Sequence, residues 1–513
     1  MIRDRRGSEL LFGLDVGTSS TKGVLARLDG EVVASAERFH RVSSPRPGWA
    51  EHDAEEVWWR EFKEVCAGLL EEVDGRVVAV CVSGIGPCFV ATGEGGHPLR
   101  PAILYGIDTR ATREIEELTD IFGFANIVER CGNALTSQST GPKIAWLRRT
   151  EPEVWKRTRY LLTAHTLIAY RLTGEYVLDH PSASLWEPLY SIERNRWIED
   201  WTTEIAPGLK MPELRWPGEL AGEVTPEAAE ATGLQAGTPV AVGSSDAFSE
   251  ATSVGIRHPG DVMIMYGTST VVLEILERAL SSPNLWSTAG LYPGTNALAG
   301  GTATSGALTT WLKKISGDIA YEDLTREAAA APPGSDALVV LPYFAGERTP
   351  FSDPGARGVM CGLTLGHGRG HLYRALLEST AYGLKHLLDA MSHAGGHGKR
   401  FVAVGGGTKG GLWTQIVSDV TGKPQELPEQ TAGASYGDAL LAGIAGGQLT
   451  PDTTWNSIAS TVEPNLDNRE LYGKLYDLYR DLYPATSSLA HVLADLQTSG
   501  GNVVDGTSDI VRR

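Results

Sequence analysis

The chain has 513 residues, of which 42% are hydrophobic and 21% are charged. A chain of this length exceeds what one hydrophobic core supports, so we expect two large domains of ordinary globular composition. The formal net charge of −18 argues against nucleic acid or an anionic membrane as a partner.

The cysteine pattern and the hydropathy limit the class of protein further. The sequence has no Cys-x-x-Cys pair and no histidine near a cysteine, so the cysteines do not indicate a metal site. Reduced cysteines are typical of the cytoplasm. No run of 18 apolar residues occurs, and residues 1–9 are too polar for a secretory signal. We therefore expect a cytoplasmic protein with no membrane partner. The five cysteines are Cys66, Cys81, Cys88, Cys131 and Cys361.

Residues 10–22, LLFGLDVGTSSTK, join an apolar run to a turn of glycine and hydroxyl residues. The apolar run predicts a buried strand, and Gly17 allows a reversal in which backbone N–H groups and hydroxyls face one point. Such a turn, with Thr18 and Ser19, is typical of a phosphate site. Asp15 adds an oxygen ligand for the Mg2+ that accompanies nucleotide phosphates. The alternative is a β-hairpin in which Asp15 and Gly17 serve the turn alone.

The pattern after this turn predicts a hairpin, a capped helix and a buried strand. The turn at Asp29 and Gly30 lies between β-rich runs, which favours a tight reversal and three antiparallel strands in all. Asp53, with Glu56 three residues later, forms a capping box for a helix. A β-branched run then predicts a strand over 77–83, which ends in Gly-Ile-Gly-Pro-Cys at the sheet edge where α/β proteins bind ligands.

The segment 98–110, PLRPAILYGIDTR, places three polar side chains on a short irregular loop. Tyr105, Asp108 and Arg110 are either solvated or contact a ligand. The tryptophans of the following region are predicted to be core or loop anchors rather than sugar platforms. They are Trp186, Trp197, Trp201 and Trp216.

Residues 238–251, TPVAVGSSDAFSEA, form the second informative stretch. The strand over 240–242 ends at Gly243, and a helix starts near Asp246. Asp246 is either a helix N-cap or a general base held at a helix start, where the ionised form is favoured. We place the domain boundary near Ser253.

A second copy of the phosphate turn follows, because residues 262–271, VMIMYGTSTV, run from an apolar strand into Gly267 and Thr268. Only the aspartate is missing. Two such turns suggest two related domains, each offering a phosphate loop to one nucleotide. No Gly-x-x-x-x-Gly-Lys-Ser/Thr pattern occurs at either turn, which excludes a P-loop protein.

The α/β alternation continues through the second half. A strand over 295–301 precedes a helix that holds Gly306, and a long helix is predicted over 369–390. The strand over 401–404 runs into three glycines that allow either close approach to a flat ligand or only a tight turn. From residue 485 onward the chain is rich in Ser, Thr and Gly and is expected to be loosely ordered, with no catalytic part.

Taken together, these stretches resemble the FGGY carbohydrate kinases along about residues 10–485. The resemblance implies an α/β fold of two actin-like, ribonuclease-H-type ATPase domains with a cleft between them. The matching motifs, in the family's order, are GLDVGTSSTK at 13–22, GWAEHDAEEVWW at 48–59, RPAILYGIDTR at 100–110, GSSDA at 243–247, YGTST at 266–270, GERTP at 346–350 and GGGTKGGLWTQ at 405–415. The implied segments are a disordered N-terminus over 1–9, a sugar-binding domain over 10–253, a nucleotide-binding domain over 254–484 and a flexible tail over 485–513.

The resemblance also implies an ATP- and Mg2+-dependent kinase that phosphorylates a sugar hydroxyl by in-line transfer. Asp246 matches the family's base, which orients the hydroxyl and accepts its proton, and is expected with Asp15 near the metal. The expected nucleotide contacts are Gly17, Thr18, Ser19, Lys22, Gly267, Thr268, Gly306, Gly405, Gly406, Gly407 and Gly411. The expected sugar contacts are Pro87, Cys88, Tyr105, Asp108, Asp246 and Ala247.

Within the family, the overall pattern is similar to that of the xylulokinases, with two departures. Gly86 and Pro87 stand where xylulokinases carry Met-His, and the segment from Tyr105 to Asp108 replaces their Trp-Asn-Asp with one residue inserted. Glycerol is disfavoured, because Pro87 and Cys88 cannot replace the charged Arg-Glu pair of glycerol kinases. A ketopentose such as D-xylulose is expected, with ribulose, gluconate or erythritol as alternatives.

Two other interpretations share the fold. An actin-like filament or chaperone ATPase would use hydrolysis to drive assembly or conformational change, but GERTP and the Asp246 motif belong to the kinases. A catalytically dead sugar sensor is disfavoured because Asp15, Asp246 and both phosphate turns are intact. Many relatives are dimers, which leaves a homodimer open as the assembly.

Overall fold

The computed structural model describes residues 9–430 and 433–499. It divides into two compact units. Unit 1 contains the chain up to 258 together with 275–297 and 432–457, and unit 2 contains the remainder. The sequence predicted a single boundary near Ser253, whereas the chain returns to unit 1 twice. The second return is helix α15 (Ala434–Ala445), and it is held by close contact: a Cβ atom on Gly13 would lie 2.0 Å from Ser435 O.

Unit 1 is built on a six-stranded mixed sheet in the order β13-β14-β5-β1-β2-β3. The first three strands of the chain are antiparallel, as predicted, while β5 and β14 run parallel to β1. The strands are β1 (Glu9–Val16), β2 (Ser20–Arg27), β3 (Val32–Phe39), β5 (Arg76–Gly84), β13 (Leu220–Glu223) and β14 (Pro239–Ala241).

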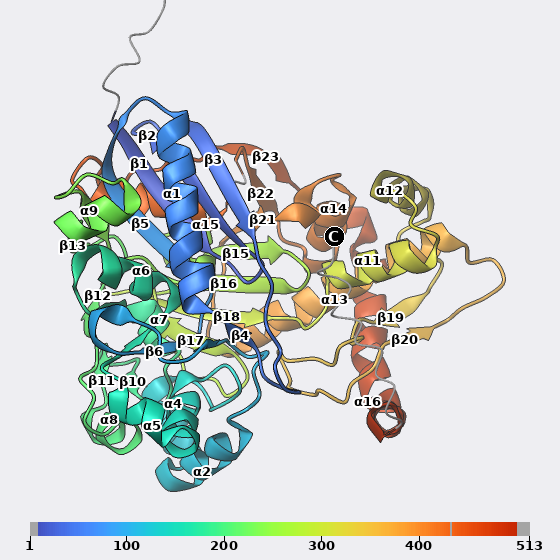
Figure 1. The fold of residues 1–513 in the computed structure, drawn as a ribbon. Coiled ribbons are helices and arrows are strands. Elements are labelled where there is room, and N and C mark those ends of the chain that lie inside the picture. The colour runs from blue at the N-terminus through green and yellow to red at the C-terminus, as the bar shows by residue number, and fades with distance from the viewer. Residues whose placement is uncertain (1–8, 431–432, 500–513) are drawn as a thin grey trace, which may run out of the picture. The chain divides into compact units, whose positions relative to one another are not determined.

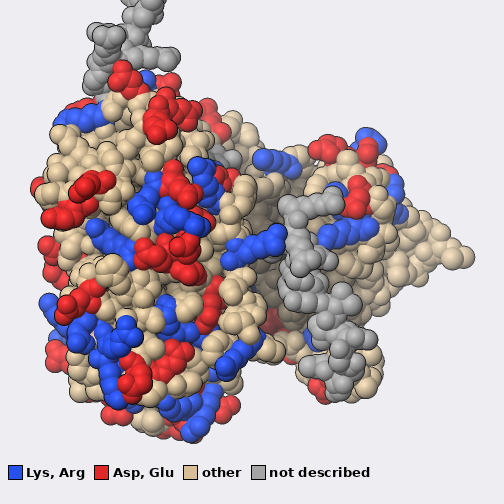
Figure 2. Space-filling model, in the orientation of Figure 1, with Lys and Arg blue, Asp and Glu red and all other residues tan. Residues whose placement is uncertain are grey.

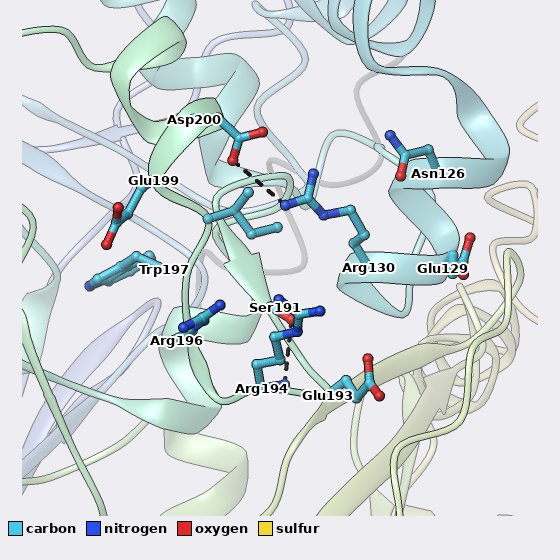
Figure 3. Close-up of a pocket in the computed structure, with 11 residues that line it drawn as sticks. Asn126, Glu129, Arg130, Ser191, Glu193, Arg194, Arg196, Trp197, Glu199 and Asp200 are labelled. Carbon is cyan, nitrogen blue, oxygen red and sulfur yellow. Dashed lines mark hydrogen bonds and ion pairs between the residues drawn. The ribbon is translucent and has the colours of Figure 1, made fainter.

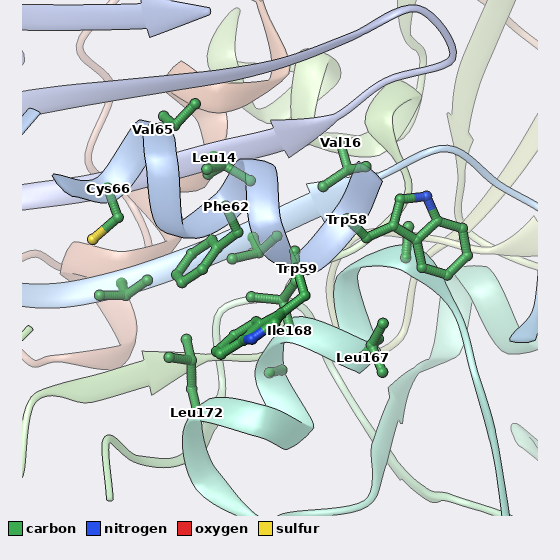
Figure 4. Packing of buried hydrophobic residues seen from close by; sticks show 14 of the residues in the cluster. Leu14, Val16, Trp58, Trp59, Phe62, Val65, Cys66, Leu167, Ile168 and Leu172 are labelled. Atoms are coloured by element: carbon green, nitrogen blue, oxygen red, sulfur yellow. The ribbon is translucent and has the colours of Figure 1, made fainter. Parts of the chain in front are cut away.

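Helix α1 (Arg60–Glu72) covers one face of this sheet (Figure 1). It follows a π-helical turn over Ala54–Trp59, which Asp53 caps by accepting hydrogen bonds from the backbone of the next turn. Phe62 is fully buried against the strands and against α6 (Ala164–Thr173), as Figure 4 shows. Burying an aromatic side chain of this size contributes about 2 to 3 kcal/mol, so this cluster holds the sheet in place beneath the site.

Many of the remaining short elements of unit 1 surround a second apolar cluster. Trp186 and Trp201 are buried in it, and Trp197 donates a hydrogen bond to Pro212 O, which agrees with the predicted anchoring role. The helices are α2 (Thr112–Phe122), α3 (Phe124–Cys131), α4 (Thr140–Thr150), α5 (Pro152–Arg157), α7 (His180–Ser184), α8 (Glu199–Ile205), α9 (Pro226–Thr232) and α10 (Asp246–Ser253). The short strands are β4 (Glu51–His52), β6 (Val90–Thr92), β7 (Ala102–Ile103), β8 (Tyr160–Leu162), β9 (Val177–Asp179), β10 (Tyr190–Ser191), β11 (Arg196–Trp197), β12 (Glu213–Arg215) and β17 (Trp286–Ala289).

Unit 2 repeats the central arrangement of unit 1. Strand β15 is antiparallel to β16 and parallel to β21, just as β1 is antiparallel to β2 and parallel to β5. This match supports the prediction of two related domains. Its strands are β15 (Asp261–Tyr266), β16 (Thr270–Leu276), β18 (Asn296–Gly301), β19 (Val339–Leu341), β20 (Val359–Cys361), β21 (Arg400–Val404), β22 (Gln425–Pro428) and β23 (Ile458–Val462). Its α-helices are α11 (Gly306–Ile315), α12 (Tyr321–Ala330), α13 (Arg369–His393), α14 (Leu412–Thr421) and α16 (Arg469–Ser499).

The prediction of a loosely ordered tail from residue 485 is wrong for residues 485–499. Helix α16 continues through Pro484 to Ser499. Ala490 and Ala494, four residues apart, are buried, and His491 and Gln497 contact Asp353 and Arg357. Residues 500–513, and residues 1–8 of the expected disordered N-terminus, lie outside the described part of the chain.

The charges of unit 1 are mixed on the face shown in Figure 2, where Lys and Arg alternate with Asp and Glu. Across residues 9–430 and 433–499, no helix is long and apolar enough to cross a membrane.

Candidate active site

The carboxyl ends of three parallel strands meet at one edge of the unit 1 sheet. Asp15 at the end of β1 pairs in register with Ser83 of β5, and Gly84 forms a bridge with Ser245 beyond β14. Only glycine fits at position 243, because a Cβ atom there would lie 1.8 Å from Val82 O. The first phosphate turn, the Gly-Ile-Gly-Pro-Cys turn and Asp246 therefore lie at the edge where α/β sheets bind ligands.

The Asp15 carboxylate is half-buried and faces β5. Its Oδ1 lies 2.9 Å from Ser83 Oγ. Lys22 of β2 stands opposite Asp15 in the register of the two strands. Burial, together with the nearby charges of Asp246 and Glu250, raises the pKa of Asp15 to about 7. The turn joins two antiparallel strands, as the β-hairpin interpretation predicted. The Asp15 carboxylate, however, contacts Ser83 of the neighbouring strand β5.

The first phosphate turn is braced by residues that the sequence did not single out. Gly17 N donates to Ser20 O at 2.9 Å, which closes the turn. Directly after β3, His40 lies with Nε2 3.1 Å from Gly17 O and with Nδ1 2.8 Å from Glu61 Oε2. The same Glu61 oxygen accepts a hydrogen bond from Thr21. These contacts fix the turn from the side of β3 and α1.

Asp246 is the first residue of α10, and Ser245 occupies the N-cap position, so the N-cap interpretation of Asp246 is not supported. Its Oδ1 accepts a hydrogen bond of 2.7 Å from Ala247 N. Burial raises the pKa of Asp246 to about 6. Glu250 lies one turn further along α10, and burial and the Asp246 charge raise its pKa to about 7. Asp15, Asp246 and Glu250 thus form a group of carboxyls that interact electrostatically.

The Gly-Ile-Gly-Pro-Cys turn packs against the start of α10, because a Cβ atom on Gly86 would lie 2.9 Å from Ser245 Cβ. Pro87 and Cys88 are both buried. The Cys88 thiol donates to Ile85 O at 3.0 Å, and burial raises its pKa to about 12. The turn is therefore uncharged and shapes the wall beside Asp246.

The predicted sugar contact Asp108 does not fit that role. Its side chain is 0% exposed, and its oxygens accept hydrogen bonds from Ala50 N and from the guanidinium of Arg110. Arg110 in turn lies 3.9 Å from the ring centroid of Trp49. Such a buried, hydrogen-bonded ion pair holds the loop in shape.

Tyr105, on the same loop, is placed next to the phosphate turn. Thr18 Oγ1 donates to its hydroxyl at 3.3 Å. Lys143, which is buried, donates to Leu104 O and Tyr105 O, and burial lowers its pKa to about 7. Tyr105 therefore lies beside the first turn, and its role as a sugar contact stays a prediction. Lys143, which holds this loop, was not predicted from the sequence.

The second phosphate turn, in unit 2, is fixed by the start of α11. Gly306 N donates to Gly267 O at 3.0 Å, and Ser305 N and Ala307 N donate to Thr268 O. A Cβ atom on Gly306 would lie 2.6 Å from Gly267 O. Gly306 therefore supports the turn from behind through close backbone contact.

The glycine loop after β21 combines packed and open positions. Gly405 has φ +93°, and a Cβ atom there would lie 2.6 Å from Tyr266 O. Gly407 packs against the ring of Trp413. Gly406 and Gly411 have open space around the position of a side chain, which is what approach by a flat ligand requires.

The GERTP motif brings a cation to the second phosphate turn. Glu347 Oε1 accepts hydrogen bonds from Ala303 N and Arg348 N. Arg348 Nε donates to Gly301 O at 2.9 Å, and its Nη2 lies 3.3 Å from Ser269 Oγ. In the sequence, this motif was only one of the matches to the family. In the structure, its Arg348 places a positive charge beside the second phosphate turn.

A surface pocket of about 560 Å3 lies elsewhere in unit 1 (Figure 3). It contains none of the predicted site residues. Arg130 and Asp200 face each other across it at 3.6 Å, and the lining carries both signs of charge. Nothing in its chemistry selects a ligand.

Within the described ranges, no group of three or more His, Cys, Asp and Glu side chains forms a metal site. Mg2+ usually takes only one or two protein carboxylates and completes its coordination with water and phosphate oxygens. Asp15 and Asp246 match that donor set, since both are half-buried carboxyls and their charges interact with each other.

Asp246→Asn is expected to stabilise the ligand-free protein at pH 8 and to have less effect at pH 5. The folded-state pKa of about 6 lies above the ordinary 3.8, so the native state binds more protons and the free energy of unfolding falls as pH rises from about 4 to 6. The gain is at most about 3 kcal/mol, from a pKa difference of about two units. The gain in stability is measured from the thermal midpoints at both pH values, with Asp120→Asn at an exposed position as the control. An equal shift at both pH values would contradict the assignment.

Comparison with known proteins identifies relatives along nearly the whole chain. Family models described as the FGGY family of carbohydrate kinases, N-terminal and C-terminal domains, match residues 10–253 and 262–446. A xylulose kinase of Staphylococcus epidermidis is 28% identical over 501 residues, 96% of this chain and 99% of its own. A glycerol kinase of Nocardia farcinica is 30% identical over 479 residues, 87% of this chain and 94% of its own. The crystal structure of xylulose kinase from Rhodospirillum rubrum matches with a TM-score of 0.86 at 34% identity, covering 94% of this chain and all of that one.

The two-domain actin-like fold, its paired glycine-hydroxyl turns and the aspartate at a helix start define a carbohydrate kinase. The chain belongs to the FGGY family of these enzymes. It is accordingly an enzyme that transfers a phosphate group from ATP to a hydroxyl of a small-molecule sugar.

Proposed function

We propose that the sugar is a ketopentose and that D-xylulose is the preferred acceptor. The observation that carries this proposal is the uncharged wall beside Asp246, made by Pro87 and Cys88. A sugar acid would gain little there, because its carboxylate would meet no cation from this turn. The similarity to two xylulose kinases supports the same choice.

Asp246 is the general base in this proposal. A carboxylate with a pKa of about 6 is ionised at neutral pH and is a stronger base than an ordinary aspartate. It orients the acceptor hydroxyl in line with the γ-phosphorus and takes its proton as the new bond forms. The hydrogen bond from Ala247 N holds the other face of the carboxyl in place.

The first turn, with Gly17, Thr18 and Ser19, and the second turn, with Gly267 and Thr268, bind phosphate oxygens of ATP through backbone N–H groups and hydroxyls. Lys22 and Arg348 add positive charge, while the open glycines 406 and 411 admit the nucleoside. Asp15 and Asp246 would hold Mg2+, which when bound neutralises phosphate charge. Positioning and charge neutralisation then supply most of the catalysis.

A coupled ADP-release assay with MgATP tests the acceptor. The panel contains D-xylulose, D-ribulose, gluconate, erythritol and glycerol, and kcat/KM is recorded for each. We expect D-xylulose to exceed the others by about 10²-fold, or about 2.7 kcal/mol of transition-state discrimination.

Glycerol is the second candidate, because the identity of 30% to a glycerol kinase lies between the 28% and 34% found for the two xylulose kinases. A glycerol value above that of every sugar would overturn the ketopentose proposal and keep the kinase class. Slow ATP hydrolysis that no acceptor accelerates would instead show that the acceptor lies outside the panel.

A further inference from the structure

Asp438 is a carboxyl that the sequence did not single out, although it is fully buried in unit 1 at 0% exposure. It lies on α15, the helix that the chain sends back to unit 1. That helix packs unusually close to its neighbours. A Cβ atom on Gly437 would lie 1.9 Å from Ser249 O of α10, so the backbone itself brings Asp438 between α10 and the sheet.

The two oxygens of Asp438 contact the two elements that carry the site carboxylates. Oδ1 accepts a hydrogen bond of 2.7 Å from Ser249 Oγ, one turn beyond Asp246 on α10. Oδ2 lies 2.6 Å from Ser83 Oγ on β5. The same Ser83 hydroxyl lies 2.9 Å from Asp15 Oδ1. One side chain therefore connects the helix of Asp246 with the carboxylate of Asp15.

We propose that Asp438 is a positioning residue for phosphoryl transfer, which fixes Asp15 and the helix of Asp246 relative to one another through Ser83 and Ser249. The inference rests on the roles proposed above for Asp15 and Asp246. A shift of about 1 Å in either group is costly, because in-line transfer depends on the geometry of the reacting atoms. Asp438 touches neither substrate and acts through these two serines.

The number of hydrogens available in the series Asp438–Ser83–Asp15 indicates how Asp438 orients Ser83. Ser83 Oγ carries one hydrogen, yet it lies within hydrogen-bond distance of a carboxyl oxygen on each side. One of the two carboxyls must therefore donate. Burial raises the pKa of Asp438 well above its usual range, which favours the neutral acid there. Asp438 then donates to Ser83, and Ser83 donates to Asp15, so the serine hydroxyl has a single orientation.

Four variants test the proposal in the full-length enzyme. Asp438→Ala and Ser83→Ala are each expected to lower kcat at least about tenfold, while KM for ATP and for the acceptor changes less than about threefold. The double variant is expected to be no slower than either single variant, because both residues act in one chain. Asp438→Asn is expected to be faster than Asp438→Ala but slower than wild type. Its amide can still donate to Ser83 Oγ and accept from Ser249 Oγ, but its NH2 group cannot accept the hydrogen bond that Ser83 N donates to Asp438 Oδ2.

Glu378→Gln is the matched control, because Glu378 is a buried, hydrogen-bonded carboxyl of unit 2. It is expected to lower the thermal midpoint and to leave kcat unchanged. Titration calorimetry with MgATP and with the acceptor gives the binding constants independently of turnover. These should change little in the Asp438 and Ser83 variants.

A kcat within about threefold of wild type for Asp438→Ala would overturn the proposal. If that variant does not fold, Ser83→Ala decides in the same way. Asp438→Asn as slow as Asp438→Ala would contradict the donor role. Asp246→Asn separates this outcome from a failure of the proposed function, because an active Asp246→Asn enzyme would refute the base itself.

Discussion

Asp246→Asn is expected to lower kcat by about 10² or more while ATP affinity stays the same. The amide keeps the shape of the side chain and the hydrogen bond from Ala247 N, but it cannot accept the proton of the acceptor hydroxyl. A general base typically contributes at least about 10² to the rate. Steady-state kinetics with saturating acceptor give kcat, and calorimetry with ATP in the absence of acceptor gives the affinity.

Glu250→Gln is the informative control for this experiment, because Glu250 lies one turn from Asp246 and has a similarly raised pKa. We expect a much smaller loss of kcat for this variant. Equal losses would indicate that the rate depends on the summed charge of Asp15, Asp246 and Glu250 rather than on a base at Asp246. An Asp246→Asn enzyme with more than about a tenth of the wild-type rate would rule out the assignment.

Gly306→Val is expected to raise the Kd for ATP more than about tenfold and to leave acceptor binding unchanged. The first side-chain carbon would lie 2.6 Å from Gly267 O, so either α11 or the second phosphate turn must move. The hydrogen bonds from Ser305 N and Gly306 N to that turn would be lost or bent. A tenfold change corresponds to about 1.4 kcal/mol, roughly the value of one or two hydrogen bonds.

Gly473→Val provides the same chemical change at an exposed position of α16 with nothing within 4 Å. It is expected to leave ATP binding at the wild-type value. Fluorescence or calorimetric titration with ATP measures both variants. An unchanged Kd in Gly306→Val would show that the second turn does not bind the nucleotide, and it would weaken the functional link drawn between the two turns.

The fold was largely predictable because its signals are local. The apolar runs before Asp15 and after residue 261 gave the central strands, and the glycine turns marked their ends. Asp246 stood out because a strand, a small-residue turn and a helix follow one another within a dozen residues. Each of these patterns depends on neighbours in the chain, which a sequence shows directly.

The contacts that support the site were not predictable in the same way. His40, directly after β3, and Glu61 of α1 brace the first turn, and Asp438 of the C-terminal part of the chain contacts Ser83. Isolated polar residues of this kind carry no spacing signal. Asp108 shows the opposite case, because a polar residue on a predicted loop is buried and paired with Arg110.

The tail was misjudged for a related reason. A proline at position 484 and the Ser- and Thr-rich residues around it are typical of a helix end. The helix nevertheless continues to Ser499. Contacts between residues distant in the sequence, such as His491 with Asp353 and Gln497 with Arg357, occur along this part of it.

The central claim is that Asp246 takes the proton from a sugar hydroxyl during transfer from ATP. A rapid-quench experiment with γ-labelled ATP and saturating D-xylulose measures that step in a single turnover, free of product release. We expect labelled sugar phosphate to form in the wild-type enzyme and to form at least about 10² times more slowly in Asp246→Asn. Equal single-turnover rates in the two enzymes would contradict the account.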